Sequence, residues 1–360
     1  MANVQAGHLN LEEIKEIEVP VEEVDKYRLQ PGDVVMTEGG DPDKLGRGTV
    51  WNGEIDLCLH QNHIFRVRPN VEMLDSHYLK AYLGSKSAQK YFLRCAKQTT
   101  GIASINKTQL RAFPVPLPPI EEQRRIAAIL DKADAVRRKR KEAIALTEEL
   151  LRSAFLEMFG DPVTNPKGWE IVELEQVCHR VTDGTHQSPE WVTEGIPFLF
   201  VSNIVEGEID FNVSKYISEE SWVSLTARCP IEVNDILYTT VGSYGNAALV
   251  RTEKRFCFQR HIAHIKPDSK KIHPKFLLGL MQSEGIRQQA DRQVRGVAQK
   301  TLNLRELKKF QVAVPPRNSQ EQYVAFRTRI EGCLNNQRDS FATQSNLFNS
   351  LLQRAFCGEL

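Results

Sequence analysis

Two long segments of the chain carry apolar residues at the spacing of a helix. Between residues 120 and 159 these residues recur every three or four positions without a proline. The spacing predicts one helix of about 40 residues, about 60 Å long. Pro118-Pro119 favours a helix start, and Gly160-Asp161-Pro162 favours its end. A second stripe predicts another helix from about Ser319 to Phe356.

Each of these predicted helices has a single apolar face, which is unfavourable for an isolated helix in water. We therefore expect the two helices to pack against each other. Antiparallel packing would place one globular domain at each end of a rod. The alternative is that each stripe faces a separate partner protein.

The segments outside the long helices predict globular α/β domains. Gly32–Thr37 is a turn that leads into a buried strand, and Asn234–Thr239 has the same pattern. Apolar residues at helical spacing between Asp75 and Cys95, and between Phe276 and Ile286, predict amphipathic helices. The expected fold class is α+β, with two α/β domains joined by two long antiparallel helices. The expected boundaries are residues 1–117, 118–160, 161–316 and 317–360.

The chain repeats itself over a distance of about 200 residues, which is too long for a solenoid repeat. The repeated unit is therefore a whole module, a globular domain followed by a long helix, and we expect its function to be performed twice. Three pairs of segments carry the repeat: Gln61–Pro69 with Gln259–Pro267, Phe113–Pro119 with Phe310–Pro316, and Leu150–Phe155 with Leu351–Phe356.

Composition limits the class of protein. The 360 residues are 41% apolar, enough for more than one core, and the formal net charge is only +1. A near-neutral chain is not a uniformly basic nucleic-acid binder, although local patches matter more than totals. The seven cysteines form no Cys-x-x-Cys pair and no signal peptide is evident. These features predict free thiols in a cytoplasmic protein, and no apolar stretch approaches the ~20 residues of a membrane span.

Several motifs resemble those of the specificity subunit of type I restriction–modification systems. A proline-rich segment that contains Glu-Glu-Gln, Pro116–Ile126, stands at the start of the first long helix, and Val314–Gln320 is its counterpart. Gly168-Trp169-Glu170, followed by Val181–His186, is similar to the opening of a target-recognition domain in that family. The resemblance covers nearly the whole chain.

The resemblance implies a subunit that reads a two-part DNA sequence, with one target-recognition domain on each half and unread base pairs between them. It also implies partners: double-stranded DNA, two methyltransferase subunits that use S-adenosylmethionine, and restriction subunits that use ATP and magnesium. Neither cofactor is expected to bind this chain. No membrane association is expected.

The two copies differ at the beginning of the first. Ala2–Leu9 aligns with Ser202–Ile209, and nothing in the first copy corresponds to Gly168–Phe200. We therefore expect the first target-recognition domain to be short at its N-terminal side. Either the start codon is internal to a longer gene, or the domain is a shortened one.

Polar loops supply the candidate DNA contacts. In the first domain, the glycine-rich loop Thr37–Gly48 lets backbone approach a partner closely, and its cations suit phosphate or guanine. The alternative is an ordinary hairpin loop with solvated charges. At the equivalent place in the second domain the side chains either read bases or cap the turn. The candidates in these two loops are Thr37, Glu38, Lys44, Arg47, Thr240, Ser243, Tyr244 and Asn246.

Further candidates lie in three other segments. Thr185, His186 and Gln187 belong to a polar loop in which a metal site is disfavoured, because no partner ligands stand at suitable spacing. Gln98–Gly101 with Lys107, and Arg295–Lys300 with Gln299 and Lys300, are matching segments, and their lysines are expected to contact the DNA backbone.

Two other groups of charged residues have open interpretations. His63 and His261 recur at equivalent positions, which favours a structural role as satisfied polar groups near the core. The run Arg137–Lys141 points all around its helix, so it is either a solvated and acid-paired surface or a contact with DNA or a partner subunit.

No catalytic motif is recognised. The phosphate-binding Gly-x-x-x-x-Gly-Lys-Ser/Thr loop is absent, and so is the Asn/Asp-Pro-Pro-aromatic tetrapeptide of adenine methyltransferases. We therefore expect a non-catalytic subunit without a cofactor or metal of its own. A pure protein scaffold and a self-contained nuclease are the alternatives that experiment must separate.

Overall fold

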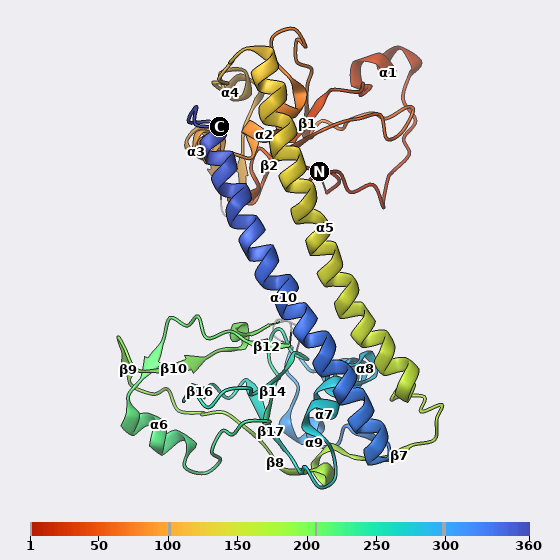
Figure 1. Ribbon diagram of the computed structural model, residues 1–360, viewed down its shortest axis with the longest axis vertical. Helices are drawn as coiled ribbons and strands as arrows, with labels where there is room; N and C mark the ends of the chain where they lie inside the picture. The colour runs from red at the N-terminus through yellow and green to blue at the C-terminus, as the bar shows by residue number, and fades with distance from the viewer. Residues whose placement is uncertain (1, 100–101, 206, 297–299) are drawn as a thin grey trace. The chain divides into compact units, whose positions relative to one another are not determined.

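The computed structural model describes residues 2–99, 102–205, 207–296 and 300–360 and confirms the α+β class. The chain divides into two compact units. Unit 1 comprises Met1–Ile144 and Asn336–Leu360, and unit 2 comprises Ala145–Asn335. Figure 1 shows the two long helices, α5 (Ile120–Phe159) and α10 (Arg317–Ala355), as continuous ribbons, and each contributes one part to each unit. None of the helices in these described ranges is long and apolar enough to cross a membrane.

Unit 1 is built around a three-stranded antiparallel sheet in the order β3-β1-β4 and a second sheet in the order β2-β6-β5. Its core joins the apolar faces of β1, α2 and α3. The elements before the long helix are α1 Val21–Tyr27, β1 Val34–Thr37, β2 Gly39–Gly40, the 3₁₀ helix Pro42–Lys44, β3 Gly48–Val50, β4 Ile64–Val67, α2 Ser76–Leu83, α3 Lys86–Cys95, β5 Lys97–Thr99, β6 Ile102–Ser104 and α4 Lys107–Arg111.

Unit 2 has two four-stranded sheets, β15-β14-β17-β8 and β16-β10-β13-β9, and two-stranded pairs β11-β12 and β18-β7. Its elements are β7 Glu170–Glu173, the 3₁₀ helix Leu174–Val177, β8 Cys178–Asp183, β9 Trp191–Val192, β10 Ile196–Leu199, the 3₁₀ helix Val201–Asn203, β11 Ile204–Val205, β12 Glu208–Ile209, β13 Tyr216–Ile217, α6 Glu219–Thr226, β14 Ile236–Thr239, β15 Ala247–Leu249, β16 Cys257–Phe258, β17 Ile262–Pro267, α7 Pro274–Met281, α8 Glu284–Gln293, α9 Leu304–Lys308 and β18 Gln311–Val314.

The predicted duplication is confirmed by the register of the sheets. In unit 1, Val34 of β1 pairs with Val50 and Val67. In unit 2, Ile236 of β14 pairs with Leu249 and Ile265, the equivalent positions. Both central strands are completely buried, as their apolar runs predicted.

The amphipathic segment 75–95 is two helices rather than one. α2 ends before Gly84, and the Ser85 side chain begins α3 by accepting a hydrogen bond from the Ala88 amide. Ser283 begins α8 in the same way by accepting from the Ile286 amide. Apolar periodicity continues across this break, whereas the serine caps mark it.

The beginning of unit 1 matches the middle of unit 2, as the alignment of Ala2–Leu9 predicted. Val4 bridges to Leu9 around Gly7 (φ 76°), and Ile204 pairs with Ile209 around Gly207 (φ 81°). The side-chain amide of Asn3 donates to the backbone carbonyl of Asn10 at 2.9 Å. The side-chain amide of Asn203 donates to the backbone carbonyl of Asp210 at 3.0 Å. The first described residues of unit 1 therefore correspond to Ser202–Ile209 of unit 2, and the described residues of unit 1 include no counterpart of β8 beside β4.

The long helices are α5, Ile120–Phe159, and α10, Arg317–Ala355. In unit 1, Arg125 donates to the Leu360 carbonyl, while the guanidinium of Arg137 lies 4.8 Å from the ring centre of Phe348. From Arg125 to Arg137 the residue numbers rise along α5, while those of their partners fall from Leu360 to Phe348. The predicted antiparallel pairing is therefore confirmed within unit 1. Ile126, Leu130 and Ala355 are buried in this contact.

In unit 2, aromatic side chains of both long helices pack against each other and against α7. Phe155 and Phe159 of α5 contact Tyr323 of α10, with ring centres 5.3 and 5.6 Å apart. Phe155 also packs on Phe276 of α7 at 5.8 Å. Phe356, which directly follows α10, contacts Tyr78 of α2 in unit 1, with ring centres 5.4 Å apart. The repeated Ala-Phe sequence at the end of each helix is therefore an anchor to the globular part of a unit.

A buried glutamine at the start of each long helix makes a second anchor. Gln123 is 1% exposed, accepts from the Asp75 amide at 3.0 Å, and donates to the carbonyls of Met73 and Pro118. Gln320 is 1% exposed, accepts from the His273 amide at 2.8 Å, and donates to the Pro315 carbonyl. The glutamine of the proline-rich motif thus ties each helix to the loop that precedes α2 or α7.

Each unit also contains a buried carboxylate beside its central strand. Asp33 is 1% exposed, receives two hydrogen bonds of 2.7 Å from Arg68, and accepts from the Gln30 amide. Burial alone would raise the pKa of Asp33. The hydrogen bonds and positive charge of Arg68, with the Gln30 amide, outweigh burial and hold this pKa below its ordinary value of 3.8. Asp235 occupies the same place in unit 2 and contacts His264 and Lys266.

We expect Asp33→Asn to lower the free energy of unfolding by about 2 kcal/mol near pH 7, because the charge-assisted bonds to Arg68 are lost. A carboxylate with a depressed folded-state pKa stabilises the fold above its unfolded-state pKa, and this stability is lost as pH falls through the folded-state pKa. Urea denaturation between pH 6 and pH 3 should therefore show a smaller acid-induced loss in the variant. An unchanged pH profile would exclude Asp33 as its source.

Candidate nucleic-acid interface

Four loops of unit 2 gather at one edge of the sheet β15-β14-β17-β8. The register pairs Thr239 with Ile262, and Ala263 with Asp183. Because neighbouring strands are antiparallel, the end of β14, the start of β17 and the end of β8 lie at the same edge. Loop 240–246 follows β14, loop 259–261 precedes β17, and loop 184–188 follows β8, so all three lie at this edge. The described residues 295–296 and 300–301 join them through the bridge between Val241 and Thr301.

Backbone hydrogen bonds hold these loops together. The Arg260 amide donates to the Thr185 carbonyl at 3.0 Å, and the Thr240 amide donates to the His261 carbonyl at 2.9 Å. The Gly242 amide donates to the Lys300 carbonyl at 2.9 Å. The structure thus brings together sequence-predicted candidates that are more than 100 positions apart in the chain. We call this set of loops the unit 2 edge.

Gly184 is required where the first loop leaves β8. A Cβ at this position would lie 2.3 Å from the Phe258 carbonyl oxygen and 2.5 Å from the Gln259 carbonyl oxygen. Both contacts are with backbone, which cannot rotate away as a side chain can. A glycine is therefore the residue that permits the close approach of loops 184–188 and 259–261.

We expect Gly184→Ala to separate these two loops and to lower the free energy of unfolding by about 1–3 kcal/mol, the range for forced overpacking. Hydrogen exchange should show lost protection at the amides of Thr185 and Arg260. Gly332→Ala is the matched control, because a Cβ at this exposed position of α10 meets nothing within 4 Å. The control should be neutral or slightly stabilising. Equal effects of the two changes would contradict the close-approach role.

Two predicted readers of the unit 2 edge are buried. Tyr244 is 5% exposed, and its hydroxyl donates to Asp291 at 2.6 Å beneath the Arg287 guanidinium, 4.4 Å from the ring centre. Thr240 is 6% exposed, and its hydroxyl donates to the His261 carbonyl. Direct base contact by these side chains is therefore disfavoured, and their interactions make them supports of the loops.

The other candidates of the unit 2 edge remain accessible. Ser243, His186 and Gln187 are exposed, and Asn246 and Thr185 are half-buried. Asn246 donates to the Ser243 carbonyl, and Thr185 donates to the Gln187 carbonyl, so these two also order their own turns. Lys300 is exposed, with its ammonium 5.9 Å from the ring centre of Tyr244. Gln299 lies outside the described residues.

His186 pairs with Asp183, with 2.8 Å between Nε2 and the carboxylate oxygen, and 63% of its side chain is exposed. Across the described ranges, no group of three or more His, Cys, Asp or Glu is arranged to hold a metal ion. Burial, together with the nearby charges of Arg260 and His186, lowers the pKa of His261 below its ordinary value. Near neutral pH this histidine is an uncharged hydrogen-bonding group.

Unit 1 assembles the corresponding edge from residues 38–47, 61–63 and 102–107. The Thr37 amide donates to the Arg47 carbonyl at 2.9 Å, and the Glu38 amide donates to the His63 carbonyl at 3.2 Å. The Ile105 amide donates to the Glu38 carbonyl at 2.9 Å. We call these loops the unit 1 edge.

The side chains of the unit 1 edge differ in accessibility. Thr37 is 5% exposed, so a direct DNA contact by this side chain is disfavoured as well. Lys44 pairs with Asp41 on the surface, and Arg47 donates to the Gln5 side chain at 3.0 Å. Lys107 is exposed at the first position of α4. Thr100 and Gly101, which belong to a candidate segment, lie outside the described residues.

The expectation that both repeated histidines are near the core is wrong for His63. Its side chain is 68% exposed and its Nδ1 lies 3.1 Å from the Glu38 carboxylate. His63 directly precedes β4 and is not part of the strand. This place explains why the histidine recurs in both copies and why its side chain is exposed. The same geometry places Arg260, an exposed cation that the sequence reasoning passed over, beside loop 184–188. Its place within the repeated segment Gln259–Pro267 was the available signal.

The basic run of α5 is partly acid-paired. Arg137 and Arg138 both contact Asp134, at 2.6 and 3.0 Å. The first of the two interpretations, a solvated and acid-paired surface, is therefore favoured for these two arginines.

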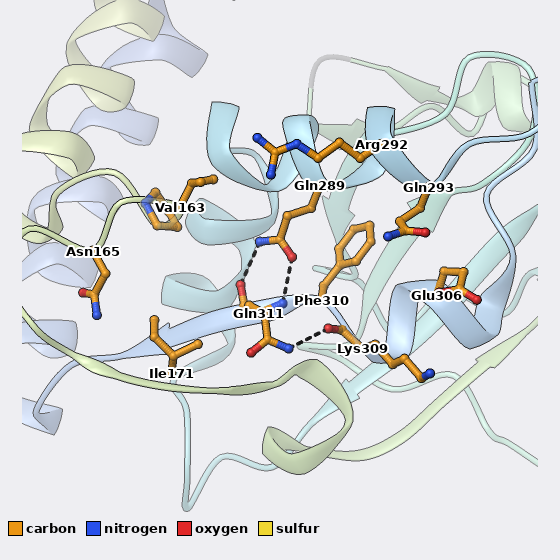
Figure 2. Close-up of a pocket in the computed structure, with 11 residues that line it drawn as sticks. Val163, Asn165, Ile171, Gln289, Arg292, Gln293, Glu306, Lys309, Phe310 and Gln311 are labelled. Carbon is orange, nitrogen blue, oxygen red and sulfur yellow. Dashed lines mark hydrogen bonds between the residues drawn. The ribbon is translucent and has the colours of Figure 1, made fainter.

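A pocket of about 430 Å³ in unit 2 is lined by none of the predicted DNA-contact residues (Figure 2). Gln289 of α8 accepts from the Gln311 amide at 2.8 Å and donates to the Gln311 carbonyl at 2.9 Å. Figure 2 shows these bonds across the pocket, where Phe310 also lines the wall. The paired amide contacts join α8 to β18, which is a structural function.

Comparison with known families decides the membership of the chain. The family model for the type I restriction modification DNA specificity domain matches residues 3–146 and 166–339, one stretch for each copy of the repeat. The chain belongs to this DNA specificity domain family. The family is named for specificity rather than for a reaction, in line with the expectation that the chain is not itself an enzyme.

Curated relatives of this specificity-domain chain include two specificity subunits. The putative MjaX specificity subunit of Methanocaldococcus jannaschii is 24% identical over 84% of this chain and 72% of its own length. The EcoBI specificity subunit of Escherichia coli is 27% identical over 93% of this chain and 75% of its own length.

Solved structures share the fold. A chain from a structural study of assembly and conformational transition of the type I R-M system has a TM-score of 0.51 at 20% identity, covering 92% of this chain and 83% of that one. The S subunit of a type I restriction–modification system from M. genitalium has a TM-score of 0.52 at 15% identity, covering 92% of this chain and 84% of that one.

Proposed function

We propose that this chain is the DNA-recognition subunit of a type I restriction–modification complex and that its two units read the two halves of a bipartite site. The observation that carries the proposal is the repetition of one arrangement. The unit 1 edge and the unit 2 edge are formed by equivalent loops at equivalent strand ends, each with accessible hydrogen-bonding and cationic side chains.

Within each edge, different side chains suit different parts of DNA. Exposed cations such as Arg260, Lys300 and Lys107 fit phosphate contacts, which fix position and register. Accessible amides and hydroxyls fit base edges in a groove, and Arg47 fits a guanine. Glu38 fits a cytosine amino group, whereas Lys44 can meet either phosphate or guanine. The proposed readers are Glu38, Lys44, Arg47, Thr185, His186, Gln187, Ser243 and Asn246.

The long helices are the proposed docking surface for modification subunits. Apolar side chains remain exposed on them although the helices pair within unit 1: Val136, Leu146, Leu150, Leu156 and Leu347 are each between 45% and 60% exposed. Exposed apolar residues in a repeated helical setting favour a protein partner. Two modification subunits and the restriction subunits would supply the chemistry and its cofactors. We place the assembly in the cytoplasm, where its DNA is.

The direct test is a mobility-shift titration with duplex DNA at two salt concentrations, with and without a type I modification subunit. We expect weak binding by the chain alone and tight, salt-dependent binding by the assembly. Tight specific binding by the chain alone, unchanged by the modification subunit, would contradict the assembly role. Absence of any salt-dependent shift would favour a scaffold, and cleavage by the chain with magnesium alone would favour a nuclease.

A further inference from the structure

A groove of about 820 Å³ lies in unit 1 beside β4, the edge strand of the sheet β3-β1-β4. Its floor is apolar and is formed by the core side of β1, β4, α2 and α4. Phe65, Val67, Phe113 and Val115 line it and are each only partly buried. Among the described residues, no strand pairs with the second side of β4, and such an edge strand above an apolar groove is a site to which another strand can add.

Unit 2 shows what fills the equivalent space. There β8 pairs with β17, so that Val181 lies opposite Ile265, and β7 pairs with β18, so that Val172 lies opposite Val312. The 3₁₀ turn between β7 and β8 inserts Leu174 and Val177 into the core. As a result Ile265 and Val312 are 0% exposed, whereas their equivalents Val67 and Val115 in unit 1 remain accessible.

A second pair of equivalent residues shows the same difference. When the alignment of Ala2–Leu9 with Ser202–Ile209 is continued along the chain, Ile17 of unit 1 is the equivalent of Ile217 of unit 2. Ile217 pairs with Ile196 and Trp191 and is 0% exposed. Ile17 is 73% exposed. Two separate surfaces of unit 1 are therefore uncovered where unit 2 is covered by residues 168–200.

The charges around the groove favour the same kind of occupant. The cations Lys26, Arg66, Lys107 and Arg111 line it, and Glu38 is the single acidic residue among its described lining. The segment that fills the space in unit 2 carries Glu170, Glu173 and Glu175 between Gly168 and Val177 and no cation there. The apolar floor distinguishes this groove from a surface built for nucleic acid alone.

We propose that the groove beside β4 receives a strand–turn–strand peptide with the pattern of Gly168–Asp183, carried by a polypeptide outside residues 1–360. Its second strand pairs antiparallel with β4, as β8 pairs with β17, and the two apolar residues of its turn enter the groove. Residues 168–183 of a second copy are a poorer occupant, because removing them would open the core of unit 2 in that copy.

The test uses a fluorescein-labelled synthetic peptide with the sequence of residues 168–183 and the full chain. We expect saturable binding and slower hydrogen exchange at residues 64–67. A peptide carrying Leu174→Asp and Val177→Asp should bind at least ten-fold more weakly, because two carboxylates would enter an apolar space. Val67→Glu in the chain should weaken binding to a similar extent. Val71→Glu is the matched control, since Val71 is 67% exposed and does not line the groove.

Ordering a free peptide is unfavourable, so the same segment is also joined ahead of Ala2 through a flexible linker, which raises its local concentration. Protection of β4 in either format, sensitive to the Asp substitutions, supports the proposal. The proposal is overturned by absence of protection in both formats or by equal binding of the two peptides. Displacement of the peptide by duplex DNA, or a dimer of the chain that Val67→Glu abolishes, would assign the groove to those occupants instead.

Discussion

Replacing Gln320 by leucine is expected to lower the free energy of unfolding of unit 2 by about 4 kcal/mol. The leucine removes a side chain that satisfies the His273 amide and the Pro315 carbonyl, each at 2.8 Å, in a site that is 1% exposed. Each buried backbone group left without a partner costs roughly 1–3 kcal/mol. Urea denaturation followed by circular dichroism measures the change.

Gln322→Leu is the matched control, because Gln322 lies on an exposed position of the same helix. Its expected effect is within about 0.5 kcal/mol. Gln123→Leu extends the prediction to unit 1, where the glutamine serves three backbone groups. A loss below about 1 kcal/mol in both units would contradict the anchoring role of the proline-rich motif, since one unsatisfied group already costs that much.

Removing the positive charges of Arg260 and Lys300 together is expected to weaken DNA binding by the assembled complex about 10- to 100-fold near 0.1 M salt. Both side chains are exposed at the unit 2 edge. If each contacts a phosphate, the slope of log affinity against log salt should fall by about 2. Fluorescence anisotropy at four salt concentrations gives both quantities.

Lys270→Ala with Lys271→Ala supplies the matched control. These two exposed cations follow the opposite end of β17, so the change in net charge is the same while the sheet edge differs. The control should leave affinity and salt slope within about two-fold of the original chain. Equal losses in the two double variants would mean that net charge, rather than the unit 2 edge, governs binding.

The sequence predicted those features that depend on repetition and periodicity. α5 begins and ends where the proline pair and Gly160 placed it, and β1 and β14 are the buried strands that their apolar runs indicated. The alignment of Ala2–Leu9 with Ser202–Ile209 held down to equivalent asparagine hydrogen bonds. These properties follow from local chemistry, which a single sequence carries.

Side-chain orientation could not be predicted in the same way. Tyr244 and Thr37 have the residue types of surface readers, yet tertiary contacts bury both. His63 recurs in both copies, as a core residue would, yet it directly precedes β4 and its side chain is exposed. The gathering of loops 184–188 and 259–261 depends on the pairing of β8 with β17, a long-range contact that leaves no periodic signal in either segment. The groove beside β4 becomes visible only when the two units are compared.

The central claim is that each unit reads one half of a two-part DNA site. Long-read sequencing of DNA modified by the assembled complex measures this through the positions of methylated adenines. In one variant, Gln187, Ser243 and Asn246 are replaced together by alanine. We predict that this variant loses sequence specificity at one half-site and keeps the specificity of the original complex at the other. Relaxation of both halves, or a single uninterrupted site in the original complex, would contradict the claim.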